Sequence, residues 1–514
     1  MSQYPGPQGP FDPQHQPAGT EGADQLSFGP APQGRGTKRG LLIGGAATAV
    51  LLVGGGAFAY QARLAPHGGQ PDSVIPATAL AYVRFDADPS VGQKIAATRF
   101  LGKLPQVAEQ GTDPDVKKTL WTFVVDAEPK LKSLDYTTDV EPWLGDRAGL
   151  ALLPGGTKDR PHVVIAVAVK DEAKAQAGIN KISTTAGGGA DLDVTTKDGF
   201  ALMTPKGDGA AVLADLAKGS LATNSTYTGD MSALGDTGIA SAWVDSKGLG
   251  DLVKSLAAGS TPVDPSQLAA AGRVSVALRF DADYVELAGS FRGGQALGKS
   301  SGAQKGAGAA SLPDDTMAAL QVNGLGDAVG AMWPQISKAL PADTISQVES
   351  QLGVTLPGDL QLVLGQSLTL ALPKQDLTSL SSANLPTVGI KDVTTDGPKV
   401  DGLVTKLSQL GSVDNVVKHG VDGNTVYLAT TDAYVARLRA SGGLGATDLF
   451  KKAVVGGDTA SVVAFADLGA LKPTYLDQVP ADYRDVVSSL TGVGLSVTTP
   501  GDGTGTFSMR LVGN

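Results

Sequence analysis

Residues 161–183 read PHVVIAVAVKDEAKAQAGINKIS, and residues 386–408 read PTVGIKDVTTDGPKVDGLVTKLS. Both stretches begin with a proline, continue as an apolar run of strand length, and pass through an aspartate into a segment with helical spacing. Because they share this plan, they decide how the rest of the chain is interpreted. The matched identities are Pro161 with Pro386, Ile165 with Ile390, Asp171 with Asp396, Lys174 with Lys399, and Lys181 with Lys406.

Three further pairs of segments occur in the same order along the chain. They are IPATALAYVRFDADPS from Ile75 with LPDDTMAALQVNGLGD from Leu312, PWLGDRAGLALLP from Pro142 with LVLGQSLTLALP from Leu362, and GDTGIASAWVD from Gly235 with GDTASVVAFAD from Gly457. The offset between partners stays near 220 to 237 residues, which is the signature of an internal repeat. We therefore predict two tandem copies, residues 73–293 and 311–514, joined by a Gly/Ser/Ala linker over 294–310.

Each predicted copy combines strands with helices. HVVIAVAV, GFALMT, IASAWV and VSVALRF have strand length and are bounded by turn residues. Asp88-Pro89 before VGQKIAATRFLGKL, and Asp171 before EAKAQAGINKI, are typical of helix starts. The strands and helices do not alternate strictly, so we expect an α+β fold with a mixed, mainly antiparallel sheet in each copy. Asp171 and Asp396 are interpreted as helix caps rather than catalytic acids.

The composition excludes several classes of function. The chain has 514 residues, of which 42% are hydrophobic and 18% charged, so it can bury a core. Its net charge of -10 argues against a nucleic-acid partner, which favours a basic surface. The absence of cysteine rules out disulfides, thiolate metal sites and a cysteine nucleophile. The few histidines, namely His15, His67, His162 and His419, do not provide a multi-histidine metal site.

The N-terminus has the pattern of a membrane anchor. Residues 1–40 are rich in Pro, Gly and Gln, and we expect a disordered tail. Arg35, Lys38 and Arg39 precede the uncharged run Leu41–Tyr60, which has about the length that a helix needs to cross a bilayer. The positive-inside rule then predicts a cytoplasmic tail, a transmembrane helix at 41–60, a juxtamembrane linker at 61–72, and an extracytoplasmic region over 61–514.

Two other interpretations fit this segment less well. A signal peptide could be cleaved after Ala57-Phe58-Ala59, but the apolar run is longer than the usual 7 to 15 residues. A buried soluble helix is disfavoured because the segment has no polar face. Gly40 and Gly44 form a G-x-x-x-G pair, which is a weak dimerisation signal among so many small residues.

Residues 293–300, GGQALGKS, match the phosphate-loop pattern G-x-x-x-x-G-K-[ST] at each fixed position. Gly293 and Gly298 are its glycines, Lys299 its lysine and Ser300 its hydroxyl. A phosphate loop needs a helix after it, because the helix N-terminus and loop amides hold the anion. The sequence SSGAQKGAGAAS that follows has no apolar stripe. We therefore predict a linker here, with no bound nucleotide.

Other catalytic and metal motifs are also incomplete. DADPSVGQKIAA from Asp86 begins like a calcium loop but lacks the glycine and glutamate of an EF-hand, so Asp86 and Asp88 are interpreted as a turn and a cap. Only His162 and His419 could serve a Ser-His-Asp site, and neither follows a nucleophile elbow. The sequence thus predicts no catalytic, cofactor-binding or metal-binding residue, and we expect core packing for the scattered tryptophans, Trp121, Trp143, Trp243 and Trp333.

A family resemblance agrees with this layout. The tail, the apolar span and the stretch Pro76–Ser90, which follows the pattern PxxxxAYVxFDxDPS, resemble an uncharacterised family of envelope proteins from high-GC Gram-positive bacteria, catalogued as domain of unknown function 3352. The resemblance extends over nearly all of the region from about Ser73 onward. It implies a single-pass protein with a large exported region, and it supplies no site residues.

Three functional hypotheses follow. The first is a non-catalytic, membrane-anchored module of the cell envelope that binds a ligand, lipid, wall polymer or partner protein. The second is an extracytoplasmic hydrolase whose site is assembled from dispersed acidic residues. A structural spacer is the third. A hydrolase should bring acids with perturbed pKa values into one pocket, whereas a binding module should present an apolar groove or patch.

Overall fold

The structure is a computed structural model that describes residues 69–104, 116–155, 161–187, 192–256, 270, 272–294, 308–341, 343–380, 385–410, 416–440 and 442–514. The predicted tail (1–40) and transmembrane span (41–60) lie outside these residues, as do most of the predicted linkers. Within the described ranges, no helix is both long enough and apolar enough to span a membrane.

Strands from both predicted copies contribute to the sheet. The strands are β1 (Ala81–Asp86), β2 (Leu144–Leu153), β3 (His162–Val169), β4 (Leu192–Lys197), β5 (Phe200–Pro205), β6 (Ala240–Asp245), β7 (Arg273–Phe280), β8 (Tyr284–Arg292), β9 (Thr316–Asn323), β10 (Ser367–Pro373), β11 (Gly389–Val393), β12 (Lys418–Asp422), β13 (Thr425–Ala429), β14 (Val462–Asp467), β15 (Leu490–Thr498) and β16 (Thr504–Gly513).

Helices connect many of these strands. The α-helices are α2 (Val91–Leu101), α4 (Val116–Ala127), α5 (Glu172–Thr185), α6 (Gly209–Leu216), α7 (Ser225–Leu234), α8 (Ser246–Leu256), α10 (Leu325–Ala339), α11 (Thr344–Leu352), α12 (Gly358–Leu364), α13 (Gly397–Leu410), α14 (Asp432–Arg439), α15 (Asp448–Ala453), α16 (Leu468–Tyr475) and α17 (Ala481–Ser488). Shorter helical turns are η1 (Pro71–Val74), η2 (Pro129–Ser133), η3 (Tyr136–Val140), η4 (Leu221–Thr223), η5 (Ala309–Ser311), η6 (Leu444–Ala446) and η7 (Leu476–Gln478).

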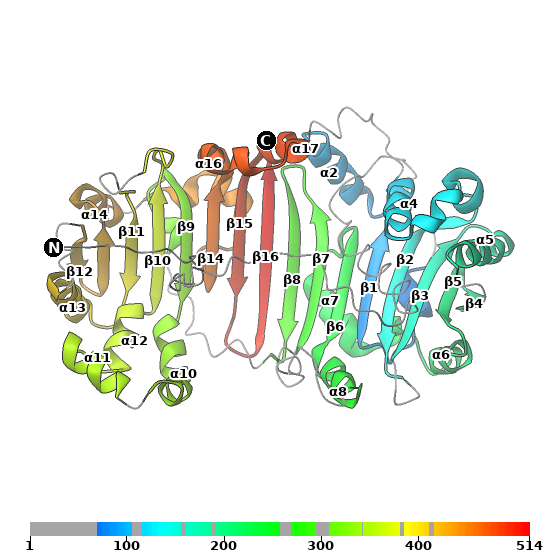
Figure 1. The fold of residues 1–514 in the computed structure, drawn as a ribbon, viewed down its shortest axis with the longest axis horizontal. Coiled ribbons are helices and arrows are strands. Elements are labelled where there is room, and N and C mark those ends of the chain that lie inside the picture. The colour runs from blue at the N-terminus through cyan, green and yellow to red at the C-terminus, as the bar shows by residue number, and fades with distance from the viewer. Residues whose placement is uncertain are drawn as a thin grey trace, which may run out of the picture. The chain divides into compact units, whose positions relative to one another are not determined.

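The strands form one 16-stranded sheet in the order β12-β13-β11-β10-β9-β14-β15-β16-β8-β7-β6-β1-β2-β3-β5-β4 (Figure 1). We call strands β1 to β8 the N-terminal half-sheet and strands β9 to β16 the C-terminal half-sheet. From its outer edge inward, the first follows the order 4-5-3-2-1-6-7-8 and the second 12-13-11-10-9-14-15-16. Adding eight to each number of the first order therefore gives the second.

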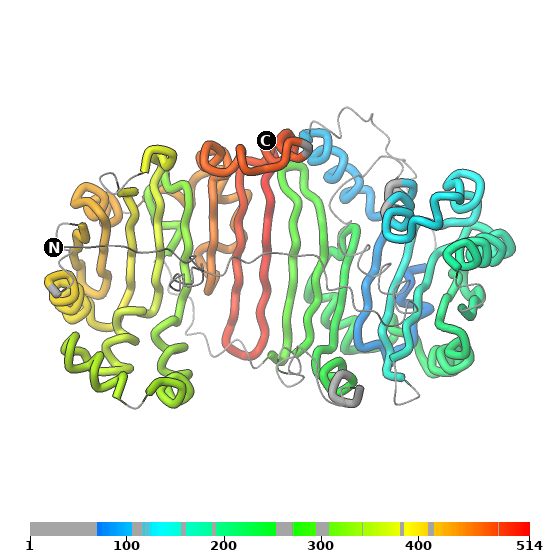
Figure 2. The backbone as a smooth tube through the Cα atoms, viewed as in Figure 1, coloured from blue at the N-terminus to red at the C-terminus, as the bar shows by residue number. Residues whose placement is uncertain are grey.

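The last strands of the half-sheets, β8 and β16, pair with each other. Their adjacency is visible in Figure 2, where the green strand β8 runs beside the red strand β16. An unpaired strand edge exposes a row of N–H and C=O groups. The pairing of β8 with β16 removes one such edge from each half-sheet and makes the sheet continuous.

The predicted α+β class is confirmed, with one correction. We expected a mixed sheet, but each pairing between neighbouring described strands is antiparallel. The chain direction alternates because tight hairpins and helical connections both return the chain beside an antiparallel neighbour. At the β4–β5 hairpin, Asp198 and Gly199 have φ of 50° and 80°, as a two-residue turn of type I′ requires.

One face of the sheet is covered by helices. In the N-terminal half-sheet, α6 and α7 pack on Tyr82, Val164 and Trp243. In the C-terminal half-sheet, α14 and α15 pack on Ala371 and Phe465. These clusters are the main cores of the two half-sheets. We call this side of the sheet the covered face and the opposite side the open face.

Two of the helix starts predicted from sequence are confirmed and one is wrong. The side chains of Asp171 and Asp396 accept hydrogen bonds from the N–H groups of Lys174 and Lys399 at 3.0 and 3.1 Å, as caps of α5 and α13 do. The cap of α2 was expected at Asp88 with Pro89 as the first helical residue. The cap is instead Ser90, which accepts from the N–H of Gln93 at 3.3 Å.

Asp88 is held outside α2 by a turn. Its N–H donates to Oδ1 of Asp86 at 2.9 Å, which fixes Asp88 before the helix begins. The carboxylate of Asp88 pairs with Lys94 instead of the first helical N–H groups. Asp86 therefore has the predicted turn role, whereas Asp88 does not cap the helix.

Candidate functional site

The open face carries a continuous apolar surface at the centre of the sheet. Directly opposed residues of antiparallel strands share a face, as do residues two positions apart along a strand. Six neighbouring strands, β10, β9, β14, β15, β16 and β8, each place three residues on it. From β10 to β8, the rows are Leu372, Ala318, Ala466, Val493, Leu511, Val285; Leu370, Leu320, Ala464, Leu495, Met509, Leu287; and Leu368, Val322, Val462, Val497, Phe507, Gly289.

We call these three rows the apolar panel, since none of their side chains is polar. In the middle row, Leu370, Leu320, Met509 and Leu287 are exposed by 41%, 42%, 41% and 40%. With strands about 4.8 Å apart and alternate residues about 6.8 Å apart, the panel measures about 24 by 14 Å between Cα atoms. No helix ribbon lies in front of β15, β16 and β8 in Figure 1. Contiguous apolar surface of this kind marks interaction sites on proteins.

Helices border the panel on two sides. On one side, α2 packs Phe100 and Leu101 against Phe85 and Phe280 of the open face, in a cluster that reaches the panel residue Val285. On the other side, α13 packs on β12 and β13, which are separated from β10 by β11. The open face beyond β1 is likewise covered, because α5 packs there on Ala201 and its neighbours. Among the described residues, the part of the open face that no helix covers is therefore central.

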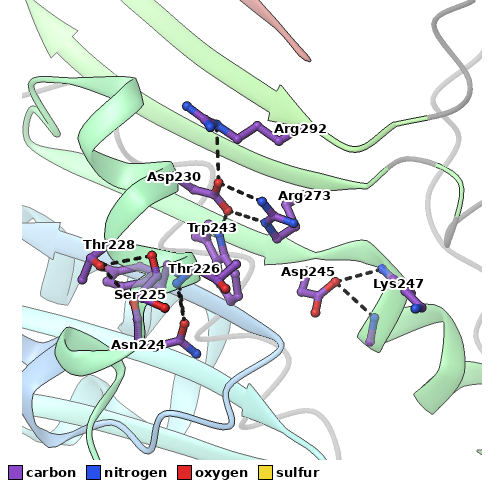
Figure 3. A network of polar contacts seen from close by, with 12 residues as sticks. Asn224, Ser225, Thr226, Thr228, Asp230, Trp243, Asp245, Lys247, Arg273 and Arg292 are labelled. Atoms are coloured by element: carbon purple, nitrogen blue, oxygen red, sulfur yellow. Dashed lines mark hydrogen bonds and ion pairs between the residues drawn. The ribbon is translucent and has the colours of Figure 1, made fainter. Parts of the chain in front are cut away.

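Polar side chains gather on the covered face instead. Figure 3 shows Asp230 of α7, which accepts hydrogen bonds from Nε1 of Trp243 at 3.0 Å and from Nε of Arg273 at 2.7 Å. Arg292 lies 3.6 Å from the same carboxylate. The hydrogen bond that Arg273 donates to Asp230 raises the pKa of Arg273. Asp230 is buried, so this network fastens α7 to β6, β7 and β8.

A second buried carboxylate joins the half-sheets. Glu286 of β8 accepts hydrogen bonds from Oγ of Ser508 at 2.6 Å and from Nε of Arg510 at 3.0 Å, both on β16, and also pairs with Arg279. Burial alone would raise the pKa of Glu286, but these hydrogen bonds and charges outweigh it and lower the pKa. Arg510 also lies over the ring of Tyr284, 3.9 Å from its centroid.

Asp86, considered above for a metal site, is paired with an arginine. Its Oδ2 accepts from Nε of Arg147 at 3.0 Å, and both side chains are buried. Asp88 is paired with Lys94. Across the described residues there is no group of three or more His, Cys, Asp or Glu side chains suited to a metal ion. Asp86 and Asp88 are thus engaged in ion pairs, and the prediction of no metal-binding residue stays a prediction.

Both folded-region histidines pair with aspartates, which the sequence did not indicate. Nδ1 of His162 lies 3.0 Å from Oδ2 of Asp208. Nδ1 of His419 lies 2.7 Å from Oδ1 of Asp401, and its Nε2 lies 3.4 Å from Oγ1 of Thr405. The second arrangement has the order of a Thr-His-Asp triad, but the Thr405 hydroxyl donates to the carbonyl of Asp401 at 2.9 Å within α13.

A nucleophile inside a helix is poorly placed for acyl transfer. The N–H groups around Thr405 belong to α13, where helical hydrogen bonds use them, so they do not form an oxyanion hole. Asp401 of α13 and His419 of β12 contact each other, and each side chain is about one-quarter exposed. The geometry is better suited to fastening α13 to the outer strand β12 than to catalysis.

One buried acid has no partner. Both carboxylate oxygens of Asp392 on β11 are buried without a hydrogen bond, and the side chain is 2% exposed. Burial raises the pKa of Asp392 to about 7. Asp392 lies on the open face next to the panel, because it pairs in register with Leu368. No sequence pattern distinguishes it from surface acids.

Only part of the phosphate-loop motif is described. Gly293 follows β8 with a φ of 70°, and its N–H donates to the carbonyl of Gly503 at 2.8 Å. The strand that precedes it is β8. Residues 295–300 lie outside the described residues, so the interpretation as a linker without nucleotide stays a prediction.

Comparison with known proteins supports the family resemblance over part of the chain. Residues 42–215 match the family described as "Protein of unknown function (DUF3352)". The match supports membership of this family for the segment that it covers, and it ends well before the extent that the resemblance implied. Among curated proteins, none is similar enough to count as a relative.

Two solved structures have weak similarity to the chain. "Structure of crystal form III of TP0453" has a TM-score of 0.21 at 10% identity, covering 44% of this chain and 80% of that chain. "Structure of crystal form I of TP0453" has a TM-score of 0.20 at 11% identity, covering 44% of this chain and 79% of that chain. Scores this low inform neither the fold nor the function of this chain.

Proposed function

We propose that the chain is a single-pass, membrane-anchored module of the cell envelope, that residues 61–514 are extracytoplasmic, and that it binds a partner without catalysis. The observation that carries the binding role is the apolar panel. A soluble sheet with one open face normally places polar side chains on that face. Here the eighteen panel positions have no polar side chain, while Ser508, Ser496 and Thr369 are buried on the other face.

We further propose that the described region arose by internal duplication. Strand pairing supports the alignment made from sequence. Since Ile75 aligns with Leu312 and Pro142 with Leu362, Val83 aligns with Leu320 and Leu150 with Leu370. Val83 pairs with Leu150, and Leu320 pairs with Leu370.

The other aligned segments agree with the pairing as well. Ile165 aligns with Ile390, and these residues pair with Leu150 and Leu370 respectively. The segments that begin with GDT align Ala242 with Ala464. Ala242 pairs with Val83, and Ala464 pairs with Leu320. The four aligned pairs of segments are thus consistent with one register in both half-sheets, and this agreement supports the proposed duplication.

A local two-fold relation between β8 and β16 also supports the proposed duplication. Following the ladder from Ala242 through Val276 leads to Gly289, and following it from Ala464 through Leu495 leads to Met509. Gly289 therefore corresponds to Met509, and Ala288 to Ser508. Ala288 and Ser508 pair with each other, as two-fold symmetry about this point requires.

The anchoring part of the proposal comes from Leu41–Tyr60 and the basic residues before it. A chain anchored there carries its panel outside the cytoplasm. Hydrolysis is the weaker alternative, because Thr405, His419 and Asp401 provide no oxyanion hole. The panel, in contrast, needs an apolar partner to lower its free energy in water.

The proposal can be tested with the full-length chain in intact bacterial cells. We expect external protease to digest the region after residue 61 while an epitope placed before Arg35 stays protected. Alkaline carbonate should leave the anchored fragment in the membrane. Digestion of the N-terminal epitope, protection of the C-terminal region, or release by carbonate would each contradict this topology.

A further inference from the structure

We propose that the occupant of the apolar panel is hydrocarbon, namely the acyl chains of a single membrane lipid lying across β10, β9, β14, β15, β16 and β8. This inference rests on the proposed function, which places the panel on the same side as, and close to, the outer surface of the membrane. It adds the chemical class of the ligand.

The panel provides no group that could recognise a polar ligand. Its side chains are aliphatic apart from Phe507 and Met509, and the ring of Phe507 lies over Gly289, where an added Cβ would come within 2.1 Å of it. The strands are paired on both sides, so their backbone N–H and C=O groups are used within the sheet. A glycan, or a peptide that adds as a strand, would find no hydrogen-bonding partner there.

The dimensions of the panel fit acyl chains better than a second copy of this protein. A stable protein interface buries about 800 Å² on each partner. The panel of about 24 by 14 Å supplies roughly 340 Å². One leaflet of a bilayer is about 15 Å of hydrocarbon, half of the roughly 30 Å core. The length of an acyl chain therefore fits within the length of the panel.

The bordering helices favour a single lipid over the bilayer surface. A helix with its side chains is about 10 Å across, so α2 and α13 stand above the plane of the panel. Phe100 and Leu101 hold α2 against Phe280 in this position. A flat bilayer, or the flat sheet of another copy, would meet these helices before it met Leu320 or Met509. A flexible chain can enter between them.

The length of chain before the described part keeps the panel near lipid. Residues 61–68 separate the end of the apolar run at Tyr60 from Gly69. At no more than about 3.6 Å per residue, these eight residues hold Gly69 within about 30 Å of the membrane surface. The described region therefore stays beside the membrane that supplies the ligand.

Photo-crosslinking tests the inference. The full-length chain is reconstituted into nanodiscs that contain phosphatidylcholine with a diazirine on one acyl chain, irradiated, digested, and mapped by mass spectrometry. We expect label on peptides that contain Leu320, Leu370 and Met509. In the double variant Leu320→Lys/Met509→Lys, label on these peptides should fall by about tenfold, since a lysine in contact with hydrocarbon costs more than 1.4 kcal/mol.

A control variant places two lysines at exposed apolar positions away from the panel. Met332 of α10 and Tyr483 of α17 are 53% and 62% exposed, and Met332→Lys/Tyr483→Lys should leave panel labelling unchanged. Thermal unfolding of both double variants checks that they fold.

The outcomes separate the two proposals. Label confined to residues 41–60 would overturn the lipid inference while supporting the anchor. Absence of label from residues 41–60 would contradict the anchor itself. Crosslinks between panel peptides of two chains, or panel labelling that the lysines do not reduce, would also overturn the inference.

Discussion

The two half-sheets have the same strand order, yet they stabilise corresponding places with different chemistry. At the C-terminal end of β1, the N-terminal half-sheet buries the ion pair of Asp86 with Arg147. The sequence alignment places Asn323 and Ser367 at these positions of the C-terminal half-sheet. The same location in the fold thus holds charged residues once and neutral residues once.

The hydrogen bonds made by residues next to these positions are nevertheless similar in the two half-sheets. Arg84 donates from its guanidinium to the carbonyl of Gly238 at 3.0 Å. Its counterpart Gln321 donates from Nε2 to the carbonyl of Ala460 at 3.3 Å, and Ala460 aligns with Gly238. The backbone acceptor is therefore retained while the donor changes from a charged to a neutral group. The comparison teaches that the fold specifies where a polar group is needed but not whether it is charged.

The helices of the covered face repeat this contrast. Tyr227 of α7 contacts Trp243 with ring centroids 5.6 Å apart, and Phe450 of α15 contacts Phe465 at 5.2 Å. Three residues after Tyr227 lies the buried Asp230, whereas Ala453 lies three residues after Phe450. The N-terminal half-sheet accordingly depends more on buried ion pairs, and mutations should reveal this.

The largest effect is expected for Asp86→Asn. It leaves the buried Arg147 without its carboxylate, which should lower the free energy of unfolding by about 3–5 kcal/mol. Guanidinium chloride unfolding of the full-length chain in detergent micelles, followed by tryptophan fluorescence, measures it. The double variant Asp86→Asn/Arg147→Ser reproduces the neutral pair of the C-terminal half-sheet and should lose less than the two single variants together. Strict additivity would show that the two side chains are not coupled.

Asp392 gives the next largest effect, with a sign set by pH. Its folded-state pKa of about 7 exceeds the ordinary value of 3.8, so the folded state retains the proton at higher pH. Its contribution to stability is fully present below about pH 4 and is lost between about pH 4 and 7, on the order of 4 kcal/mol in total. Asp392→Val, which copies the aligned Val167, should stabilise the chain at pH 8 and flatten this pH dependence.

The matched control for Asp392 is Asp251→Val at an exposed position of α8, which should leave the pH dependence intact. The comparison is made on unfolding curves at pH 5 and pH 8. A variant Asp392→Val that loses stability equally at both values would show that the carboxylate has a partner in the folded protein.

Asp230→Ala should have an intermediate effect. The carboxylate is buried, but its partner Arg273 is 34% exposed and can be solvated when the pair is lost. We therefore expect a loss of about 2–3 kcal/mol, below that of Asp86→Asn. Asp215→Ala, at an ion pair on the surface of α6, should cost under about 0.5 kcal/mol. Equal losses in both variants would indicate that the network of Figure 3 contributes little.

The smallest effect on stability is expected for a substitution on the open face, where the two half-sheets can be compared at aligned leucines. Leu370 and Leu150 occupy aligned positions, but Leu370 is 41% exposed and Leu150 is only partly exposed. Leu370→Lys should cost under about 1 kcal/mol because its charge reaches water, whereas Leu150→Lys should cost more. A larger loss for Leu370→Lys than for Leu150→Lys would mean that the panel is covered within the folded chain.

Much of the fold was predictable from local patterns. Apolar runs such as HVVIAVAV specify strands, Asp171 and Asp396 specify helix starts, and the matched segments specify which strands correspond. The Asp88 prediction was wrong because a cap depends on which nearby side chain reaches the first free N–H. Ser90 reaches it, while Asp88 is held in the turn with Asp86.

By itself, the sequence determined the α+β class and the starts of helices such as α5 and α13, because these depend on the periodicity and capping of neighbouring residues. Only the tertiary structure decided that β8 pairs with β16, that Asp86 meets Arg147, and that Leu320, Met509 and Leu287 form one exposed surface. Those features join residues that are distant along the chain. A strand in which apolar and polar residues alternate has an apolar face whether or not that face is covered. Only the placement of the helices decides whether the face is buried or open to a ligand.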